Sequence, residues 1–267
     1  MKCSKSHSSA FSSRIWLIGG TQESAELAQA IAQTNLPCTI SVTTQSARSL
    51  YPTGSNIQVQ VGRFNLSQIE EFLQQQQIVA ILDASHPYAV EISHHAIALS
   101  QKLQIPYLRY ERPNLAQGEQ GKQGGKLDSF ETLLSGNYLQ GRVLLTVGYR
   151  PLHLFQPWQE RATLFARILP SAIALESALA SGFTPDRLIC LRPPICAQLE
   201  KALWCQWNIS LVVTKASGTA GGEDIKRTVA AQLNIPLIVI ARPAIEYPQQ
   251  TSDLSVALDF CLQLAQN

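Results

Sequence analysis

Short apolar runs alternate with segments of helical period along most of the chain, and this alternation limits the possible folds most strongly. Strands are predicted at 15–18, 38–42, 57–61, 78–82 and 106–108, and again at 142–147, 162–168, 187–191, 209–214 and 237–241. Helices are predicted at 22–33, 65–75 and 88–103, and at 128–135, 171–180, 195–206, 222–233 and 252–264. Nearly continuous apolar strands separated by helices indicate parallel sheets with both faces covered. The chain is therefore predicted to form two doubly wound, Rossmann-like α/β domains.

The boundaries of these domains follow from two segments that have little to bury. Residues 114–126, NLAQGEQGKQGGK, contain four glycines and predict a linker or mobile loop. Residues 1–13 contain six serines and lack the apolar core of a secretory signal, so they predict a disordered tail. We therefore expect one domain at 14–113 and a second at 127–267.

Two parts of the chain repeat the same pattern. Gln104–Pro113 reads QIPYLRYERP and Asn234–Pro243 reads NIPLIVIARP, and each follows an apolar strand with a short polar turn, ILDAS at 81–85 and VVTKAS at 212–217. The repeat favours two domains of related topology, each with a sheet edge at its Arg-Pro. The alternative is that Ile-Pro is simply common where a helix turns into a strand.

The charge composition excludes several classes of function. Lys and Arg number 21 and Asp and Glu 19, for a net charge of +2, which predicts neither a nucleic-acid partner nor a membrane surface. No apolar run reaches the roughly 18 residues of a membrane helix. The six cysteines form no C-x-x-C pair, so we expect reduced thiols in a cytoplasmic protein and no metal site.

A glycine turn lies between the first strand and the first helix. Gly19 and Gly20 would let a ligand approach the backbone, and Thr21 is a plausible N-cap for a helix whose free N–H groups attract phosphate. Ser24 and Ala25 stand where the last glycine of G-x-G-x-x-G would be, and Glu23 would repel a phosphate placed directly on it. The alternative is an ordinary tight turn.

The end of the second strand indicates which dinucleotide would bind. No Asp or Glu lies between Glu26 and Glu70, and Thr43, Thr44 and Arg48 follow the strand instead. An acid would hold the ribose hydroxyl of NAD, whereas hydroxyls and an arginine suit the 2′-phosphate of NADP. Alternatively, Arg48 is only a solvated helix residue.

Further turns follow other predicted strands, at the sheet edge where open α/β folds bind ligands. They are Gly62-Arg63-Phe64, Asp83-Ala84-Ser85-His86-Pro87-Tyr88, and Thr146-Val147-Gly148-Tyr149-Arg150. His86 could bind a ligand or act as an acid, or it could be a structural turn histidine. The segment Thr214–Gly222, TKASGTAGG, with Lys226 after it, offers a lysine and backbone donors to an anion. It is not a Walker A loop, because G-K-[ST] is absent.

Four of these segments together resemble the precorrin-6A reductase family of cobalamin biosynthesis, which includes the cobalt-precorrin-6A reductases. They are Gly19-Gly20-Thr21-x-Glu23, Asp83-Ala84-Ser85-His86-Pro87-Tyr88-Ala89, Arg109-x-Glu111-Arg112-Pro113, and Thr214-Lys215-x-Ser217-Gly218-x-x-Gly221-Gly222 with Lys226. Thr146-x-Gly148 also fits, and the resemblance runs from about residue 14 to residue 245.

The resemblance implies an enzyme that uses NADPH to reduce one double bond of precorrin-6A, or of its cobalt form, to the 6B form. The partner would be a small-molecule tetrapyrrole, and the protein a monomer or weak homodimer. Because the macrocycle is too large for one small sheet, the active site is expected in the cleft between the domains.

The resemblance also implies which residues form the site. The cofactor-binding residues would be Gly19, Gly20, Thr21, Glu23, Thr43, Thr44, Arg48, Gly62, Phe64, Asp83, Ser85, His86 and Pro87. The substrate-binding residues would be Tyr88, Arg109, Arg112, Gly148, Arg150, Lys215, Ser217, Gly218, Gly221 and Gly222. Its arginines and Lys215 suit a ligand rich in carboxylates. The proton donor stays open between His86, Tyr88, Lys215 and solvent.

Two other classes of protein would share some of these sequence features. An NADP-dependent reductase or epimerase of another Rossmann family would share the glycine turn but should show a Tyr-x-x-x-Lys pair, which we do not find. A non-catalytic nucleotide-binding module would explain the glycine turns without a substrate. The sequence leaves open whether the substrate contains cobalt.

Overall fold

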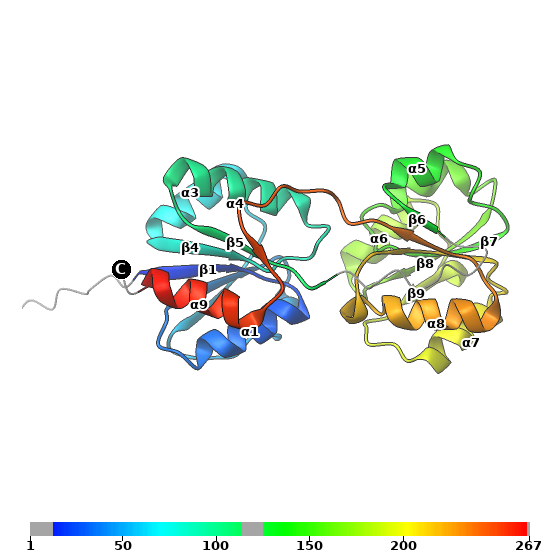
Figure 1. Ribbon diagram of the computed structural model, residues 1–267. Helices are drawn as coiled ribbons and strands as arrows, with labels where there is room; N and C mark the ends of the chain where they lie inside the picture. Colours follow the sequence, from blue (N-terminus) through cyan, green and yellow to red (C-terminus); the bar gives the residue numbers. More distant parts are fainter. Residues whose placement is uncertain (1–12, 114–124, 266–267) are drawn as a thin grey trace, which may run out of the picture. The chain divides into compact units, whose positions relative to one another are not determined.

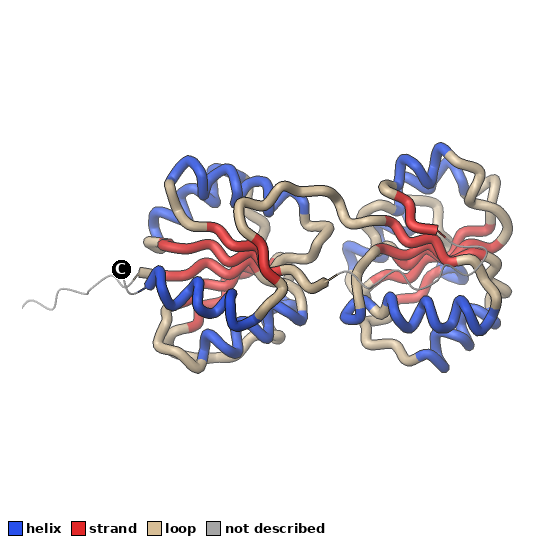
Figure 2. Tube along the Cα trace, in the orientation of Figure 1, coloured by secondary structure: helices blue, strands red, loops and turns tan. Residues whose placement is uncertain are grey.

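The structure, a computed structural model, describes residues 13–113 and 125–265. It divides into two compact units. The first unit contains the chain up to Arg112 together with the segment from Ala244 onward, and the second contains Pro113–Pro243. Each unit is a parallel sheet between two layers of helices (Figures 1 and 2).

The sheet of the first unit has six strands in the order β12-β5-β4-β1-β2-β3. The strands are β1 (Arg14–Ile18), β2 (Cys38–Val42), β3 (Ile57–Val61), β4 (Ile78–Asp83), β5 (Tyr107–Tyr110) and β12 (Gln250–Thr251). The helices are α1 (Gln22–Ala32), α2 (Gln45–Arg48), α3 (Leu66–Gln75), α4 (Val90–Leu103) and α9 (Leu254–Ala265). Figure 1 shows α3 and α4 on one face of this sheet and α1 and α9 on the other.

The second unit repeats this plan with the order β6-β11-β10-β7-β8-β9. Its strands are β6 (Gly125–Leu127), β7 (Arg142–Thr146), β8 (Thr163–Ile168), β9 (Leu188–Cys190), β10 (Leu211–Lys215) and β11 (Leu237–Ile240). Its helices are α5 (Phe130–Ser135), α6 (Ala172–Ala180), α7 (Ala197–Gln206) and α8 (Glu223–Leu233), with short 3-10 turns at Leu152–Trp158, Pro185–Arg187 and Thr219–Gly221. The fold class predicted from the sequence is confirmed.

Strand β1 shows why the apolar runs predict buried parallel strands. Ile15 and Leu17 pack into the core beneath α1 and α9, whereas Trp16 and Ile18 pack into the core beneath α3 and α4. Side chains alternate between the two faces of a strand. Because helices cover both faces, every position from Ile15 to Ile18 is apolar and buried.

The predicted boundary at 127–267 is wrong at its C-terminal end, because residues from Ala244 onward fold with the first unit. The backbone N–H groups of Arg109 and Glu111 each donate to the returning segment, to the carbonyls of Gln249 and Thr251, at 2.9 Å. Helix α9 then buries Ala257 and Cys261 completely against the first sheet.

The predicted linker also differs from the structure at its end. Gly125 and Lys126, placed in the linker by the sequence, belong to β6 and pair in parallel with β11. The rest of that predicted linker, and the predicted tail apart from Ser13, lie outside the described residues.

The repeated Arg-Pro pattern marks equivalent positions in the two sheets. It follows β5 in the first and β11 in the second, and these strands occupy the same place in the strand order. The related topology is therefore confirmed. The expectation that each Arg-Pro strand forms an edge is wrong, since β12 covers β5 and β6 covers β11. In the part of the chain that the structure describes, no helix combines the length and apolar character needed to cross a membrane.

Candidate functional site

The side chain of Tyr51 packs against the glycine turn after β1. The Tyr51 hydroxyl accepts a hydrogen bond from the Gly20 N–H at 2.5 Å and lies 2.7 Å from the Ser24 hydroxyl. A Cβ atom on Gly19 would lie 2.3 Å from the same oxygen, so only glycine fits there. Burial raises the pKa of Tyr51, so the hydroxyl stays protonated. Sequence reasoning missed Tyr51, because nothing local connects it with a turn 31 residues earlier.

Thr21 is the N-cap of α1, as the sequence predicts. Its hydroxyl accepts from the Ser24 N–H at 3.0 Å and donates to the Ala84 carbonyl at 2.9 Å. Both roles of the hydroxyl are therefore used within the fold. Among the described residues, nothing binds the backbone N–H groups of Gln22 and Glu23. These first N–H groups of a helix are the donors that an anion would use.

A pocket opens at the carboxyl ends of β1, β4 and β5. It is lined by Thr21, Glu23, Ala84, Ser85, Pro87, Arg109, Tyr110, Glu111 and Arg112. Within it the Arg112 guanidinium forms an ion pair with the Glu23 carboxylate, and both side chains are mostly buried. The pocket brings together predicted cofactor-binding and predicted substrate-binding residues.

Asp83 is fully buried beneath the turn that carries His86. Its carboxylate accepts from the hydroxyls of Ser93 and Tyr107 at 2.7 Å each, and from the Arg109 guanidinium at 2.9 Å. Burial, followed by the negative charge of Asp83, raises the pKa of Tyr107. Asp83 thus organises the interior of this turn, and its predicted part in binding the cofactor stays a prediction.

Arg109 is as completely enclosed as Asp83. Its guanidinium donates to the Ser85 hydroxyl at 3.1 Å and to Glu111 at 2.9 Å, and it lies 5.1 Å from the ring centre of Tyr247. The sequence places Arg109 among the substrate-binding residues and Ser85 among the cofactor-binding ones. With no exposed side-chain surface, Arg109 is better placed to hold Ser85 than to meet a ligand.

His86 and Tyr88 lie together at the exposed end of this turn. The His86 Nδ1 accepts a hydrogen bond from the Tyr88 N–H at 3.2 Å, and the two ring centres are 5.8 Å apart. In the neutral ring the proton is therefore on Nε2. Pro87 between them is buried.

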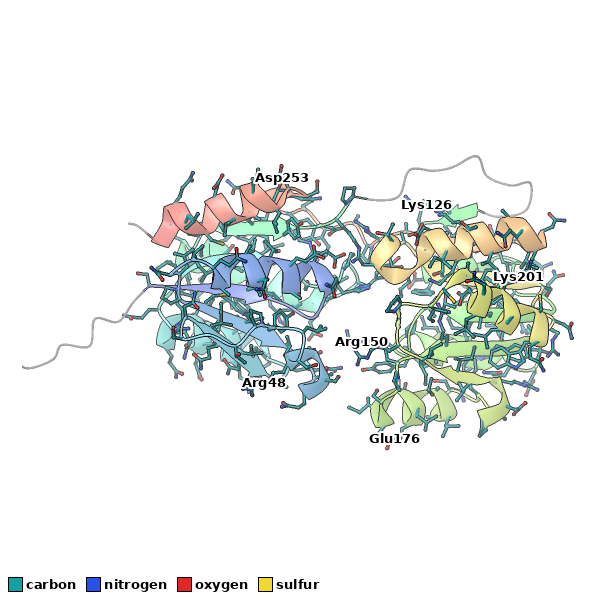
Figure 3. All side chains as sticks on the ribbon, turned by 90° about the horizontal axis from the view of Figure 1, so that it is seen from below. Arg48, Lys126, Arg150, Glu176, Lys201 and Asp253 are labelled. Atoms are coloured by element: carbon teal, nitrogen blue, oxygen red, sulfur yellow. The ribbon has the colours of Figure 1, made fainter. Side chains whose placement is uncertain are left out.

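The carboxyl ends of β2 and β3 carry the remaining predicted cofactor residues. Thr43, Thr44 and Arg48 are exposed, and Thr44 caps the short helix α2 (Figure 3 labels Arg48). Gly62 follows β3 directly and bonds to the Val42 carbonyl. Phe64 stacks on Phe72 with ring centres 5.6 Å apart, so one face of its ring belongs to the core.

At the carboxyl edge of the second sheet, two cations lie close to each other. Lys215 ends β10, and Arg150 follows β7, the neighbouring strand, at the surface of the unit (Figure 3). Burial, together with the charge of Arg150, lowers the pKa of Lys215 to about 8. The Lys215 ammonium lies 5.8 Å from the ring centre of Phe130. Gly148, which follows β7, has a φ of +76° and open space where a side chain would be.

The loop from Ser217 to Gly222 uses several of its backbone donors internally. The Gly218 N–H donates to the Glu223 carboxylate at 2.9 Å, and the N–H groups of Gly221 and Gly222 donate to carbonyls inside the loop. Buried Lys226 donates to the carbonyls of Gly221 and Gly222 at 2.7 and 3.0 Å. The N–H groups of Gly218, Gly221 and Gly222 are thus used internally, and the predicted anion site would rely on the remaining donors together with Lys215.

The fold and this arrangement define a two-unit, Rossmann-like α/β protein with basic side chains at the carboxyl edges of its sheets. The family described as precorrin-6x reductase CbiJ/CobK matches the chain over residues 14–262. The chain belongs to this family of oxidoreductases, whose chemistry implies a nicotinamide cofactor.

The sequences of individual relatives match nearly the whole length of this chain. A cobalt-precorrin-6A reductase of Synechocystis is 47% identical over 248 residues, covering 92% of this chain and 95% of the relative. A cobalt-precorrin-6A reductase of Priestia megaterium is 30% identical, with 87% and 92% covered. The solved structure of a CobK precorrin-6A reductase superposes with a TM-score of 0.76 at 22% identity, covering 94% of this chain and 96% of that one, which supports the fold.

Proposed function

We propose that this protein reduces one double bond of the macrocycle of cobalt-precorrin-6A, or of metal-free precorrin-6A, to the 6B form in cobalamin biosynthesis. The observation that carries the proposal is the family match over 14–262, joined by a relative at 47% identity named for this activity. The substrate is a tetrapyrrole rich in carboxylates.

The first unit is proposed to bind NADPH. When bound, NADPH supplies a hydride to one ring carbon, and the neighbouring carbon takes a proton. The N–H groups of Gln22 and Glu23 suit the pyrophosphate, because nothing else among the described residues binds them. Exposed Thr43, Thr44 and Arg48 suit the 2′-phosphate, which favours NADPH over NADH.

The second unit is proposed to bind carboxylates of the substrate. Burial lowers the pKa of Lys215, and the positive charge of Arg150 lowers it further. A carboxylate placed between two such cations relieves the repulsion between them. The open space beside Gly148 leaves room for a ligand at the same edge.

The proton for the second carbon has two candidate sources in the first unit. His86 could give a proton only as its imidazolium ion, which would lose the hydrogen bond that Nδ1 accepts from the Tyr88 N–H, and the Tyr88 hydroxyl lies on the neighbouring ring. Lys215 and solvent remain further candidates.

The reaction itself tests this proposal. Purified protein mixed with NADPH and cobalt-precorrin-6A should consume the NADPH absorbance while the macrocycle spectrum changes. NADH should be the poorer donor. A parallel reaction with metal-free precorrin-6A decides which form is preferred. Unchanged NADPH absorbance with both macrocycles would refute the proposed function.

A further inference from the structure

Glu23 stands at an unfavourable place for a protein that binds a dinucleotide. It is the second residue of α1, and its own N–H is one of the two donors that remain for a pyrophosphate. A carboxylate in the first turn stabilises the helix dipole, but it repels a second anion that arrives at the same helix end.

Arg112 compensates for this charge. Its guanidinium pairs with the Glu23 carboxylate, and the two side chains are 14% and 16% exposed, so solvent screens them little. The other arginine of the pocket, Arg109, is already held by Asp83 and Glu111. Removing the charge of Arg112 would therefore leave Glu23 uncompensated beside α1.

We propose that Arg112 is a positioning residue for the cofactor rather than a ligand of the substrate. It neutralises Glu23 and holds its carboxylate in the pocket, so that the pyrophosphate can accept hydrogen bonds from the N–H groups of Gln22 and Glu23. This inference rests on the proposed binding of NADPH by the first unit.

The family resemblance instead assigns Arg112 to the substrate, and the two roles predict different effects when Arg112 is lost. If Arg112 acts through Glu23, its loss matters only while Glu23 is charged. If Arg112 binds a substrate carboxylate, its loss affects the macrocycle whether or not Glu23 is present. A double-mutant cycle separates these two roles.

The experiment measures the Kd of NADPH by calorimetry in the absence of macrocycle. Arg112→Gln should weaken NADPH binding about tenfold, because the uncompensated Glu23 carboxylate repels the pyrophosphate. Glu23→Gln should bind NADPH at least as tightly as the wild type. The double variant should return to the affinity of Glu23→Gln, because the charge that Arg112 neutralises is gone.

A matched control removes one positive charge elsewhere in the same unit. Lys102 pairs with Glu70 on the surface, at 2.6 Å, and Lys102→Gln should leave the Kd unchanged. Thermal unfolding of each variant checks that the fold is intact, and rescue by Glu23→Gln excludes simple misfolding as the cause.

Two results would overturn the inference alone. One is an Arg112→Gln variant with wild-type NADPH affinity and a raised KM for the macrocycle. The other is a weakened affinity that Glu23→Gln does not restore. A wild-type protein that binds no NADPH would instead overturn the proposed cofactor together with this inference.

Discussion

Lys215 shows how one residue acquires its chemistry from its surroundings. Burial removes water from its ammonium, and the nearby charge of Arg150 disfavours a second cation, so its pKa falls to about 8. An ordinary lysine has a pKa of about 10.4 and stays charged throughout the physiological range. Lys215 is therefore mostly charged at pH 7 and mostly neutral at pH 9.

This shift predicts a pH dependence of substrate binding. Because a lowered pKa means that the proton is lost as pH rises through about 8, the KM for the macrocycle should increase between pH 7 and pH 9. The substrate carboxylates stay ionised across this range. Lys215→Arg keeps its charge, since the pKa of arginine exceeds 12, and should abolish the increase.

The control for this titration is the Kd of NADPH, which should stay level between pH 7 and pH 9. If the Lys215→Arg variant showed the same rise in KM as the wild type, another group would be responsible. Lys215→Met should raise the KM already at pH 7, because it lacks the charge at every pH.

At the scale of elements, the sequence predicts the strands that contain an apolar run, including the edge strands β3 and β9, and misses the short edge strands β6 and β12. Each strand predicted from an apolar run is present. The inner strands have side chains buried on both faces, whereas β3 and β9, at the outer edges, are only partly buried and are still predicted by their apolar residues. Strands β6 and β12 have only three and two residues, and their burial is incomplete. They exist because β11 and β5 offer open edges, which is a property of the assembled sheet.

In the candidate site, the sequence predicts the local contacts but not those between residues far apart in the chain. The capping of α1 by Thr21 is local and follows from the sequence. The pairing of Arg112 with Glu23 joins positions 89 residues apart, and Tyr51 reaches its turn from 31 residues away. Such contacts depend on which strands are neighbours, so spacing alone could not predict them.

The loop between β10 and α8 offers a test at the element scale. A Cβ atom on Gly221 would lie 2.0 Å from the hydroxyl oxygen and 2.3 Å from the Cβ of Ser217. We expect Gly221→Ala to lower the free energy of unfolding by about 1–3 kcal/mol, the usual cost of overpacking. Urea denaturation at constant slope measures the change.

The partner of this clash provides the control. Ser217→Gly removes both atoms that the new methyl group would meet, so Gly221→Ala should cost much less in that background. An equal cost in both backgrounds would show that the loop backbone, and not the contact with Ser217, requires glycine at 221.

At the scale of the whole molecule, the two sheets have the same strand order but obtain their edge strands differently. The second unit contains all of its strands within Pro113–Pro243. The first unit depends on the end of the chain for β12 and for α9, whose Ala257 and Cys261 are completely buried. We therefore expect the two units to differ in whether they fold when each is produced as a separate fragment.

A fragment of residues 113–243 should fold alone and unfold cooperatively in urea, because its sheet and both helical layers are complete. A fragment of residues 1–112 should show no cooperative transition, since the face of its sheet that packs against α9 is exposed. Fusing residues 244–267 to it through a flexible linker should restore the transition. Near-ultraviolet circular dichroism would follow tertiary packing in all three. If residues 1–112 unfolded cooperatively with the same midpoint as the fusion, the returning segment would add nothing to the first unit's stability, contrary to the burial of Ala257 and Cys261.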